Sequence, residues 1–175
     1  MVYIRVLLLD NFLVMWMLRL GIDIGGTKLE AALIGTDGLV MARKRIPTEA
    51  NLGCEHIVKR VGKLAKEVLG ESSIYKVGVG LPGSLSPKTG LLRNSNTVCL
   101  NGQPLKDLIE NELNHSIVLE NDANCFALAE SIMGAGKNYN NVFGLILGTG
   151  CGGGVVLKGK IHLGVNLIAG EWGHH

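Results

Sequence analysis

Two segments of the chain combine glycines with hydroxyl side chains, a composition that suits a loop around phosphate. The first reads Gly-Ile-Asp-Ile-Gly-Gly-Thr-Lys at residues 21–28, where an alternating apolar strand runs into a turn. Glycine lets backbone N–H groups approach anionic oxygens without a Cβ in the way. The candidate ligands here are Asp23, Gly25, Gly26, Thr27 and Lys28. The same residues also fit an ordinary hairpin turn, since neither G-x-x-x-x-G-K-S/T nor a helix-opening G-x-G-x-x-G is present.

The second such segment favours the phosphate interpretation over the hairpin turn. Residues 147–154 read Leu-Gly-Thr-Gly-Cys-Gly-Gly-Gly and lie between an apolar strand at 142–147 and a returning strand at 155–157. We expect a β-hairpin whose tip, residues 148–154, presents backbone N–H groups to an anion. The candidate ligands at this tip are Gly148, Thr149 and Gly150.

A carboxylate occurs where a short strand meets a helix. The strand at 117–119 ends in Glu-Asn-Asp-Ala-Asn at 120–124, immediately before a helix. Asp122 can act there as a general base that takes the proton of an attacking hydroxyl. An acidic residue at a helix start is also a common N-cap, so both roles stay open.

Composition excludes several classes of protein. The 175 residues are 47% hydrophobic and 18% charged, as in a globular domain, and the net charge of +2 is too small to indicate a nucleic-acid partner. The four cysteines are far apart and form no C-x-x-C pair, which favours a reduced, cytoplasmic protein.

The first 16 residues are apolar but interrupted by Asp10 and Asn11. A membrane span needs about 20 consecutive apolar residues, and the stretch also lacks the features of a signal peptide. We therefore expect no membrane partner, and we expect residues 1–16 to lie outside the fold.

The remaining pattern predicts an α/β protein. Alternating strands from residue 18 to Ile46 form a three-stranded meander, and a helix at 51–70 leads to a strand at 77–81. A turn at 82–84, amide-rich loops at 94–96 and 101–103, and a helix after Pro104 follow. Ligands of such folds bind at the carboxyl ends of the strands.

Four motifs, in order, resemble the ROK family of sugar kinases and sugar-responsive repressors. They are the segments at 23–28, 121–124, 148–154 and 170–174. The resemblance implies an actin-like ATPase (ribonuclease H-like) fold, with a small domain at 17–120 and the beginning of a large domain at 121–175. The loops at 82–90 and 100–104 look most like the bacterial fructokinase (manno-fructokinase) branch.

The resemblance also implies roles for the candidate residues. Asp122 would be the catalytic base toward the C6 hydroxyl of fructose, both glycine loops would hold ATP, and Asp23 would position Mg²⁺ through water. The implied sugar ligands are Gly83, Asn96, Asn101, Asn121, Glu171 and His174.

One departure from the family concerns zinc. In the family a histidine that matches His174 binds Zn²⁺ with a cysteine cluster further on, and this chain contains no such cluster. We therefore expect the chain to correspond to the first half of a kinase. Apolar surface from Val142 onward would then be uncovered and would favour self-association, including a homodimer.

Three alternatives stay open at this point. A repressor of the same family would need a helix-turn-helix before the first strand, and residues 1–16 contain no basic recognition helix. A fragment that binds sugar or nucleotide without turnover is the second alternative. Within the kinases, a glucokinase or an N-acetylglucosamine kinase is the third.

Overall fold

A computed structural model describes residues 17–72, 75–147 and 151–170. The expectation about residues 1–16 therefore lies outside the described residues. Within the described part of the chain, no helix is long and apolar enough to cross a membrane.

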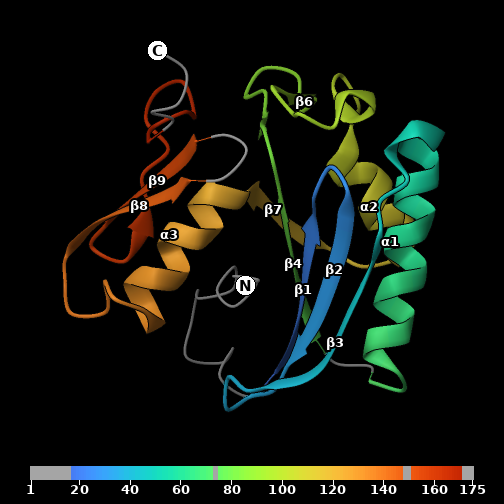
Figure 1. The fold of residues 1–175 in the computed structure, drawn as a ribbon, viewed down its shortest axis with the longest axis horizontal. Coiled ribbons are helices and arrows are strands. Elements are labelled where there is room, and N and C mark those ends of the chain that lie inside the picture. The colour runs from blue at the N-terminus through green and yellow to red at the C-terminus, as the bar shows by residue number, and fades with distance from the viewer. Residues whose placement is uncertain (1–16, 73–74, 148–150, 171–175) are drawn as a thin grey trace.

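A five-stranded mixed sheet forms the centre of the structure (Figure 1). Its strands, in the spatial order β3-β2-β1-β4-β7, are Val40–Pro47, Lys28–Ile34, Leu18–Ile24, Tyr75–Leu81 and Ile117–Asn121. The first three are antiparallel, whereas β4 and β7 run parallel to β1. The predicted meander and returning strand are confirmed, and the parallel strands place their carboxyl ends at one edge, next to the turn after β1.

Two helices cover one face of this sheet (Figure 1). Helix α1 (Cys54–Leu69) follows a short turn, η3 (Ala50–Leu52), and helix α2 (Leu105–Leu113) connects β4 to β7. Helix α1 starts later than the predicted 51–70, because Gly53 has a φ of 89° and breaks the helical path. Gly70 ends the helix, as predicted. Between the helices and the sheet lies the main core, which includes Ile22, Leu64 and Val79.

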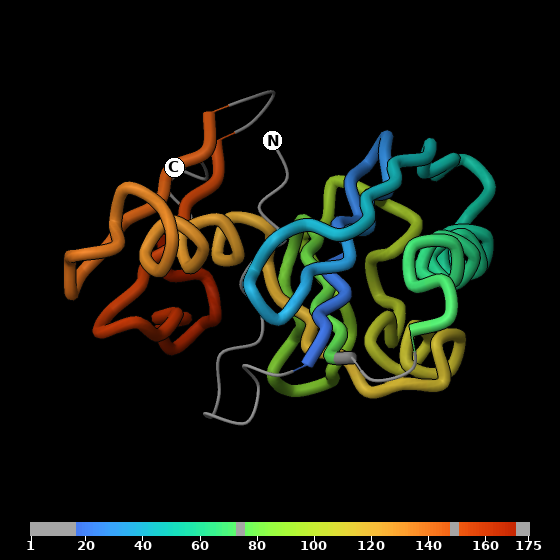
Figure 2. The backbone as a smooth tube through the Cα atoms, turned by 90° about the horizontal axis from the view of Figure 1, so that it is seen from below, coloured from blue at the N-terminus to red at the C-terminus, as the bar shows by residue number. Residues whose placement is uncertain are grey.

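A second group of elements lies on the other side of the sheet from α1 and α2 (Figure 2). Helix α3 (Asp122–Met133) continues directly from β7, and β8 (Asn141–Leu147), β9 (Cys151–Leu157) and β10 (Lys160–Ile161) form an antiparallel sheet against it. Two small elements, the hairpin β5 (Ser84–Leu85) and β6 (Leu92–Arg93) and the turn η4 (Val98–Leu100), complete the described chain.

The prediction of a glycine loop at 148–154 is wrong at its carboxyl end. Strand β9 begins at Cys151, so the last three glycines of the motif belong to a strand. A Cβ on Gly154 would lie 2.7 Å from the carbonyl oxygen of Ala123 and 2.9 Å from the Cβ of Ala127. Gly154, and Gly152 on the same face, therefore allow α3 to pack closely on the hairpin.

The face of the hairpin turned away from α3 is apolar and partly exposed. Gly144 packs on α3, whereas Leu145 and Leu147 are 37% and 75% exposed. Because such a patch favours association, we expect self-association in sedimentation velocity, weakened severalfold by Leu147→Lys. Val98→Lys is the matched control, since Val98 is 78% exposed but lies in η4. A wild-type chain that stays monomeric at all concentrations would contradict this expectation.

Candidate active site

The first glycine turn connects β1 to β2, and its backbone is well defined. The N–H of Gly25 donates to the carbonyl oxygen of Lys28 at 3.0 Å, and a Cβ on Gly25 would lie 2.9 Å from that oxygen. Glycine is therefore required by the turn itself, and in this conformation its N–H is not available to a phosphate. Gly26 and Thr27 are exposed, and among the described residues their N–H groups have no hydrogen-bond partner.

Asp23 lies near the end of β1, in a row of facing residues. It pairs in register with Gly80 of β4, which in turn pairs with Glu120 of β7. A Cβ on Gly80 would come within 3.4 Å of the sulfur of Cys125 on α3. The absence of a side chain at Gly80 thus lets the first turn of α3 approach the sheet at a point between Asp23 of β1 and Glu120 of β7.

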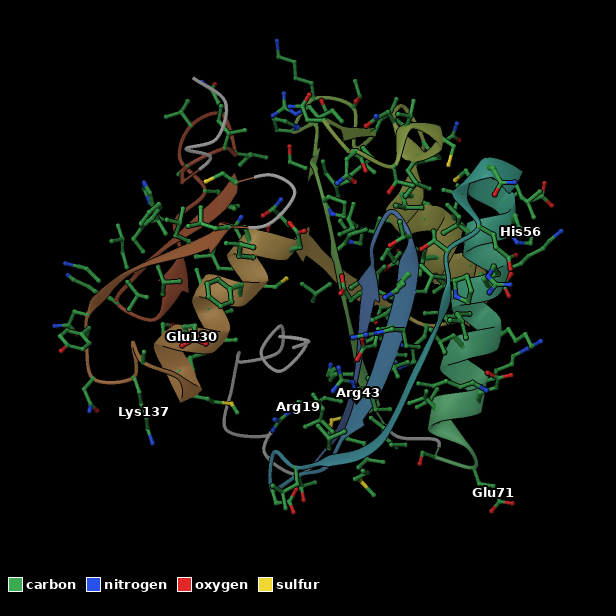
Figure 3. The ribbon with its side chains drawn as sticks, in the orientation of Figure 1. Arg19, Arg43, His56, Glu71, Glu130 and Lys137 are labelled. Atoms are coloured by element: carbon green, nitrogen blue, oxygen red, sulfur yellow. The ribbon has the colours of Figure 1, made fainter. Side chains whose placement is uncertain are left out.

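A charged cluster continues this row across β2 and β3. Glu30, the partner of Asp23 on β2, is 2% exposed and forms ion pairs with both Arg43 and Arg45. Lys44 between them pairs with Glu67 of α1, so the two arginines lie on the opposite face, where Figure 3 labels Arg43. A buried carboxylate needs such partners because desolvation of an unpaired charge is costly.

The environment of Asp23 favours its protonated form. Burial, followed by the negative charges of Asp122 and Glu30, raises its pKa to about 6, and Arg45 opposes this shift. Of these two charges, Asp122 has the larger effect on the pKa of Asp23. A partly buried carboxylate with acidic neighbours offers hard oxygen ligands that suit a divalent cation.

Asn121, not Asp122, caps helix α3. Its Oδ1 accepts from the N–H groups of Ala123 at 2.9 Å and Asn124 at 3.1 Å. The alternative role of Asp122 as N-cap is therefore wrong. Asp122 is the first residue of the helix and is exposed, yet desolvation by the surrounding protein raises its pKa, partly opposed by hydrogen bonds from the N–H of Ala123 and its own N–H. A carboxylate with a raised pKa is a stronger proton acceptor.

The corner between β7 and α3, which contains Asp122, is held in place by two neighbouring side chains. The Oε1 of Glu120 accepts from the N–H of Asn121 at 2.7 Å and from the side-chain amide of Asn124 at 3.0 Å. Asn124 is only 6% exposed. The backbone on both sides of Asp122 is thus fixed while its own side chain stays accessible.

Gly83 is brought to the same corner by Asn121. The Nδ2 of Asn121 donates to the carbonyl oxygen of Gly83 at 3.1 Å. Gly83 has a φ of 101°, and a Cβ there would lie 2.6 Å from the carbonyl oxygen of Arg93. Since the cap and this bond use most of the amide of Asn121, one N–H hydrogen remains for a ligand among the described contacts.

The two other candidate amides lie in one loop but differ in their surroundings. Asn96 is exposed, and its Oδ1 is 3.8 Å from the position of a Cβ on Gly26, so it lies beside the phosphate turn. Asn101 instead holds the backbone of Ser95, accepting from its N–H and donating to its carbonyl oxygen, both at 2.9 Å. Asn101 therefore stabilises the conformation of its own loop.

The other predicted ligands lie outside the described residues. They are Gly148, Thr149, Gly150, Glu171 and His174. Among the described residues, no group of three His, Cys, Asp or Glu side chains could hold a metal ion. The predicted zinc ligand and the second phosphate loop stay predictions.

Sequence reasoning missed Thr48 and the roles of Glu120 and Asn124. The sequence does contain a signal for Glu120 and Asn124, because an acid and an amide lie four residues apart on either side of a strand end. Thr48, a buried threonine after a proline, gives no comparable signal. It contacts the phosphate turn only because β3 returns beside β2.

A mixed sheet of this order, with carboxylates from β1 and α3 beside a glycine turn, defines an actin-like ATPase fold. The chain belongs to the ROK family, whose sequence profile matches residues 19–175. The predicted fold and family are thus confirmed.

Individual relatives are sugar kinases by name. The N-acetylgalactosamine kinase AgaK of Shewanella sp. (strain ANA-3) is 38% identical over 157 residues, covering 88% of this chain and 50% of the relative. The N-acetyl-D-glucosamine kinase of Aliivibrio salmonicida (strain LFI1238) is 40% identical over 155 residues, covering 88% and 51%. A ROK family glucokinase from Streptomyces griseus, solved in complex with glucose and AMPPNP, superposes with a TM-score of 0.80 at 31% identity, covering 90% and 50%.

These relatives bear on two expectations. The chain spans about half the length of the curated relatives it matches. Their names give no support to the fructokinase branch that the loops at 82–90 and 100–104 suggested.

Proposed function

We propose that the chain carries the acceptor-activating and phosphate-binding half of an ATP-dependent sugar kinase. The observation that carries the proposal is the placement of two carboxylates, Asp23 near the end of β1 and Asp122 at the start of α3 directly after β7, at the edge of the sheet where an exposed glycine turn follows β1. Phosphoryl transfer to an alcohol needs a base for the alcohol proton, donors for the phosphates and a site for a divalent cation. This corner of the protein offers residues suited to each task.

We assign the role of proton acceptor to Asp122. The sugar hydroxyl oxygen, at C6 in a hexose, forms a bond to the γ-phosphorus of ATP as the bond to ADP breaks, and Asp122 accepts the hydroxyl proton. The exposure of Asp122 lets an alcohol reach it, and the Asn121 cap and the Glu120 brace hold it in place. Asn121, Gly83 and Asn96 would orient the sugar, with Glu171 and His174 as further proposed ligands and Asn101 acting through its loop.

We assign phosphate binding to the first glycine turn, at residues 25–28, and propose the same role for the second glycine segment, at residues 148–150. The N–H groups of Gly26 and Thr27 and the side chain of Lys28 are exposed, whereas Gly25 shapes the turn. The hard oxygen donor Asp23 suits Mg²⁺, which would neutralise phosphate charge when bound. Binding of Zn²⁺ by His174 also stays a proposal. The other zinc ligands would have to come from outside the described residues.

The sugar is the least defined part of the proposal. The names of the relatives favour glucose or an N-acetylhexosamine over fructose as the acceptor. We further propose a cytoplasmic enzyme whose residues 17–120 form the small domain and residues 121–175 the start of the large one. Because the chain spans half of its relatives, the second candidate function is a fragment that binds sugar or nucleotide without turnover.

Formation of ADP from ATP, followed with N-acetylglucosamine, N-acetylgalactosamine, glucose, fructose or no sugar, tests these proposals. We expect ADP formation that depends on at least one sugar and on Mg²⁺. MgATP or sugar binding without sugar-dependent turnover would favour the binding fragment. A chain that neither binds MgATP nor consumes it in the presence of any of the sugars would overturn the kinase proposal.

A further inference from the structure

Thr48 holds both sides of the first glycine turn. It follows directly after β3 and is 0% exposed. Its Oγ1 donates to the carbonyl oxygen of Gly25 at 2.6 Å, and its N–H donates to the carbonyl oxygen of Thr27 at 3.0 Å. A single buried residue thus bonds to the peptide unit that joins Gly25 to Gly26 and to the one that joins Thr27 to Lys28.

The segment that carries Thr48 is itself fixed to helix α1. Arg60 donates from Nε to the carbonyl oxygen of Pro47 at 2.9 Å and pairs through Nη1 with the carboxylate of Glu49 at 3.0 Å. The ring of His56, labelled on α1 in Figure 3, lies 2.7 Å from the same carboxylate. Glu49 has a left-handed φ of 56°, a conformation that a non-glycine residue adopts only where its surroundings hold it.

These contacts form a continuous connection from α1 to the turn. Because the carbonyl groups of Gly25 and Thr27 point at Thr48, their peptide planes are fixed, and so are the directions of the N–H groups of Gly26 and Lys28 in those planes. The peptide unit that carries the N–H of Thr27 lies between these two fixed planes. Donors that are already oriented bind an anion without the cost of ordering a flexible loop. Thr48 is too deeply buried to contact the anion itself.

We infer that Thr48 is a positioning residue that sets the phosphate-binding geometry of the Gly25–Gly26–Thr27 turn through its hydroxyl group. The inference rests on the proposed function, since it takes the γ- and β-phosphates of a nucleoside triphosphate as the ligand of that turn. It adds the residue that follows β3, with its support on α1, to a site otherwise built from β1, β7 and α3.

The test titrates the whole chain with MgATP and follows the ¹⁵N amide resonances of Gly26 and Thr27. Thr48→Val keeps the shape of the side chain and removes the hydroxyl donor, so we expect MgATP to bind about tenfold more weakly, which corresponds to about 1.4 kcal/mol. Thr48→Ser keeps the hydroxyl and should bind within about twofold of wild type. Thr36→Val, the same change at an exposed position in the turn between β2 and β3, is the matched control and should bind as wild type does.

The outcomes separate this inference from the proposed function. Wild-type affinity in Thr48→Val, or an equal loss in Thr48→Ser and Thr48→Val, overturns the role of the hydroxyl while the proposed function stands. No binding by the wild-type chain overturns both. If Thr48→Val does not fold, Thr48→Ser decides, because affinity within about twofold supports the inference and a tenfold loss contradicts it.

Discussion

Replacing Asp122 by Asn is expected to lower sugar-dependent turnover by about 10²–10⁴-fold, the range typical of a lost general base. Asn has nearly the same shape and cannot accept the hydroxyl proton at neutral pH. Because Asn121 provides the helix cap, the substitution should leave the start of α3 intact. We therefore expect the dissociation constants for sugar and MgATP to change little while turnover falls.

The matched control for this variant is Asp107→Asn. Asp107 is an exposed acid in the first turn of α2, so the same charge is removed from a comparable helix position away from the site. Turnover in Asp107→Asn should equal that of wild type. Undiminished turnover in Asp122→Asn, measured by ADP release, would show that another group takes the proton.

The pH dependence provides a second readout of the same assignment. Desolvation raises the pKa of Asp122, so the fraction of the active, ionised base decreases at a higher pH than it would for an ordinary aspartate. The acid limb of the turnover profile should therefore lie above pH 3.8, the ordinary value. The residual activity of Asp122→Asn should lack that limb.

The sequence predicts most of the fold because its local patterns and its tertiary contacts agree. Alternation in β1 and β2 places Ile22 and Leu29 in the core, and the apolar stripe of α1 packs Leu64 against the same face. Strand and helix periodicities of this kind survive folding because burial of the apolar face is what stabilises the element. The meander and α1 were accordingly predicted with only small errors in their limits.

Positions where two residue types could serve the same purpose were less predictable. Asn121 and Asp122 are both good N-caps, and only the bonds that Oδ1 of Asn121 accepts from the N–H groups of Ala123 and Asn124 show which one caps the helix. Glycine at 152–154 was assigned to a loop because glycine is common in turns, although its small size also allows close packing. Neither distinction exists in the local sequence.

Contacts between distant segments could not be predicted at all. Thr48 is separated from Gly25 by the whole of β2 and β3, and its bond exists because the strands return in register. The placement of Asp23 and Asp122 at the same edge of the sheet likewise depends on β4 lying between β1 and β7. Such facts follow from topology, which the pattern of each segment does not specify.

Replacing Asp23 by Asn is expected to stabilise the chain at neutral pH while weakening MgATP binding. The pKa of Asp23 is 3.8 in the unfolded chain and about 6 in the folded one, so the folded state binds the extra proton between these values. The favourable contribution of Asp23 is complete below pH 3.8 and is lost as the pH rises through about 6. At pH 7 the ionised carboxylate costs up to about 3 kcal/mol, which the neutral amide avoids.

Urea unfolding at pH 4, 5 and 7 without Mg²⁺ measures this effect. The stability gain of Asp23→Asn should be small at pH 4 and should grow to a plateau above pH 6, where the wild-type carboxylate is ionised in both states. Asp122→Asn should produce a smaller gain of the same sign, because removing its charge lowers the pKa of Asp23. A loss of stability in Asp23→Asn at pH 7 would mean that the carboxylate holds the fold together, whereas a gain with loss of MgATP binding identifies a group kept for its ligand at the expense of stability.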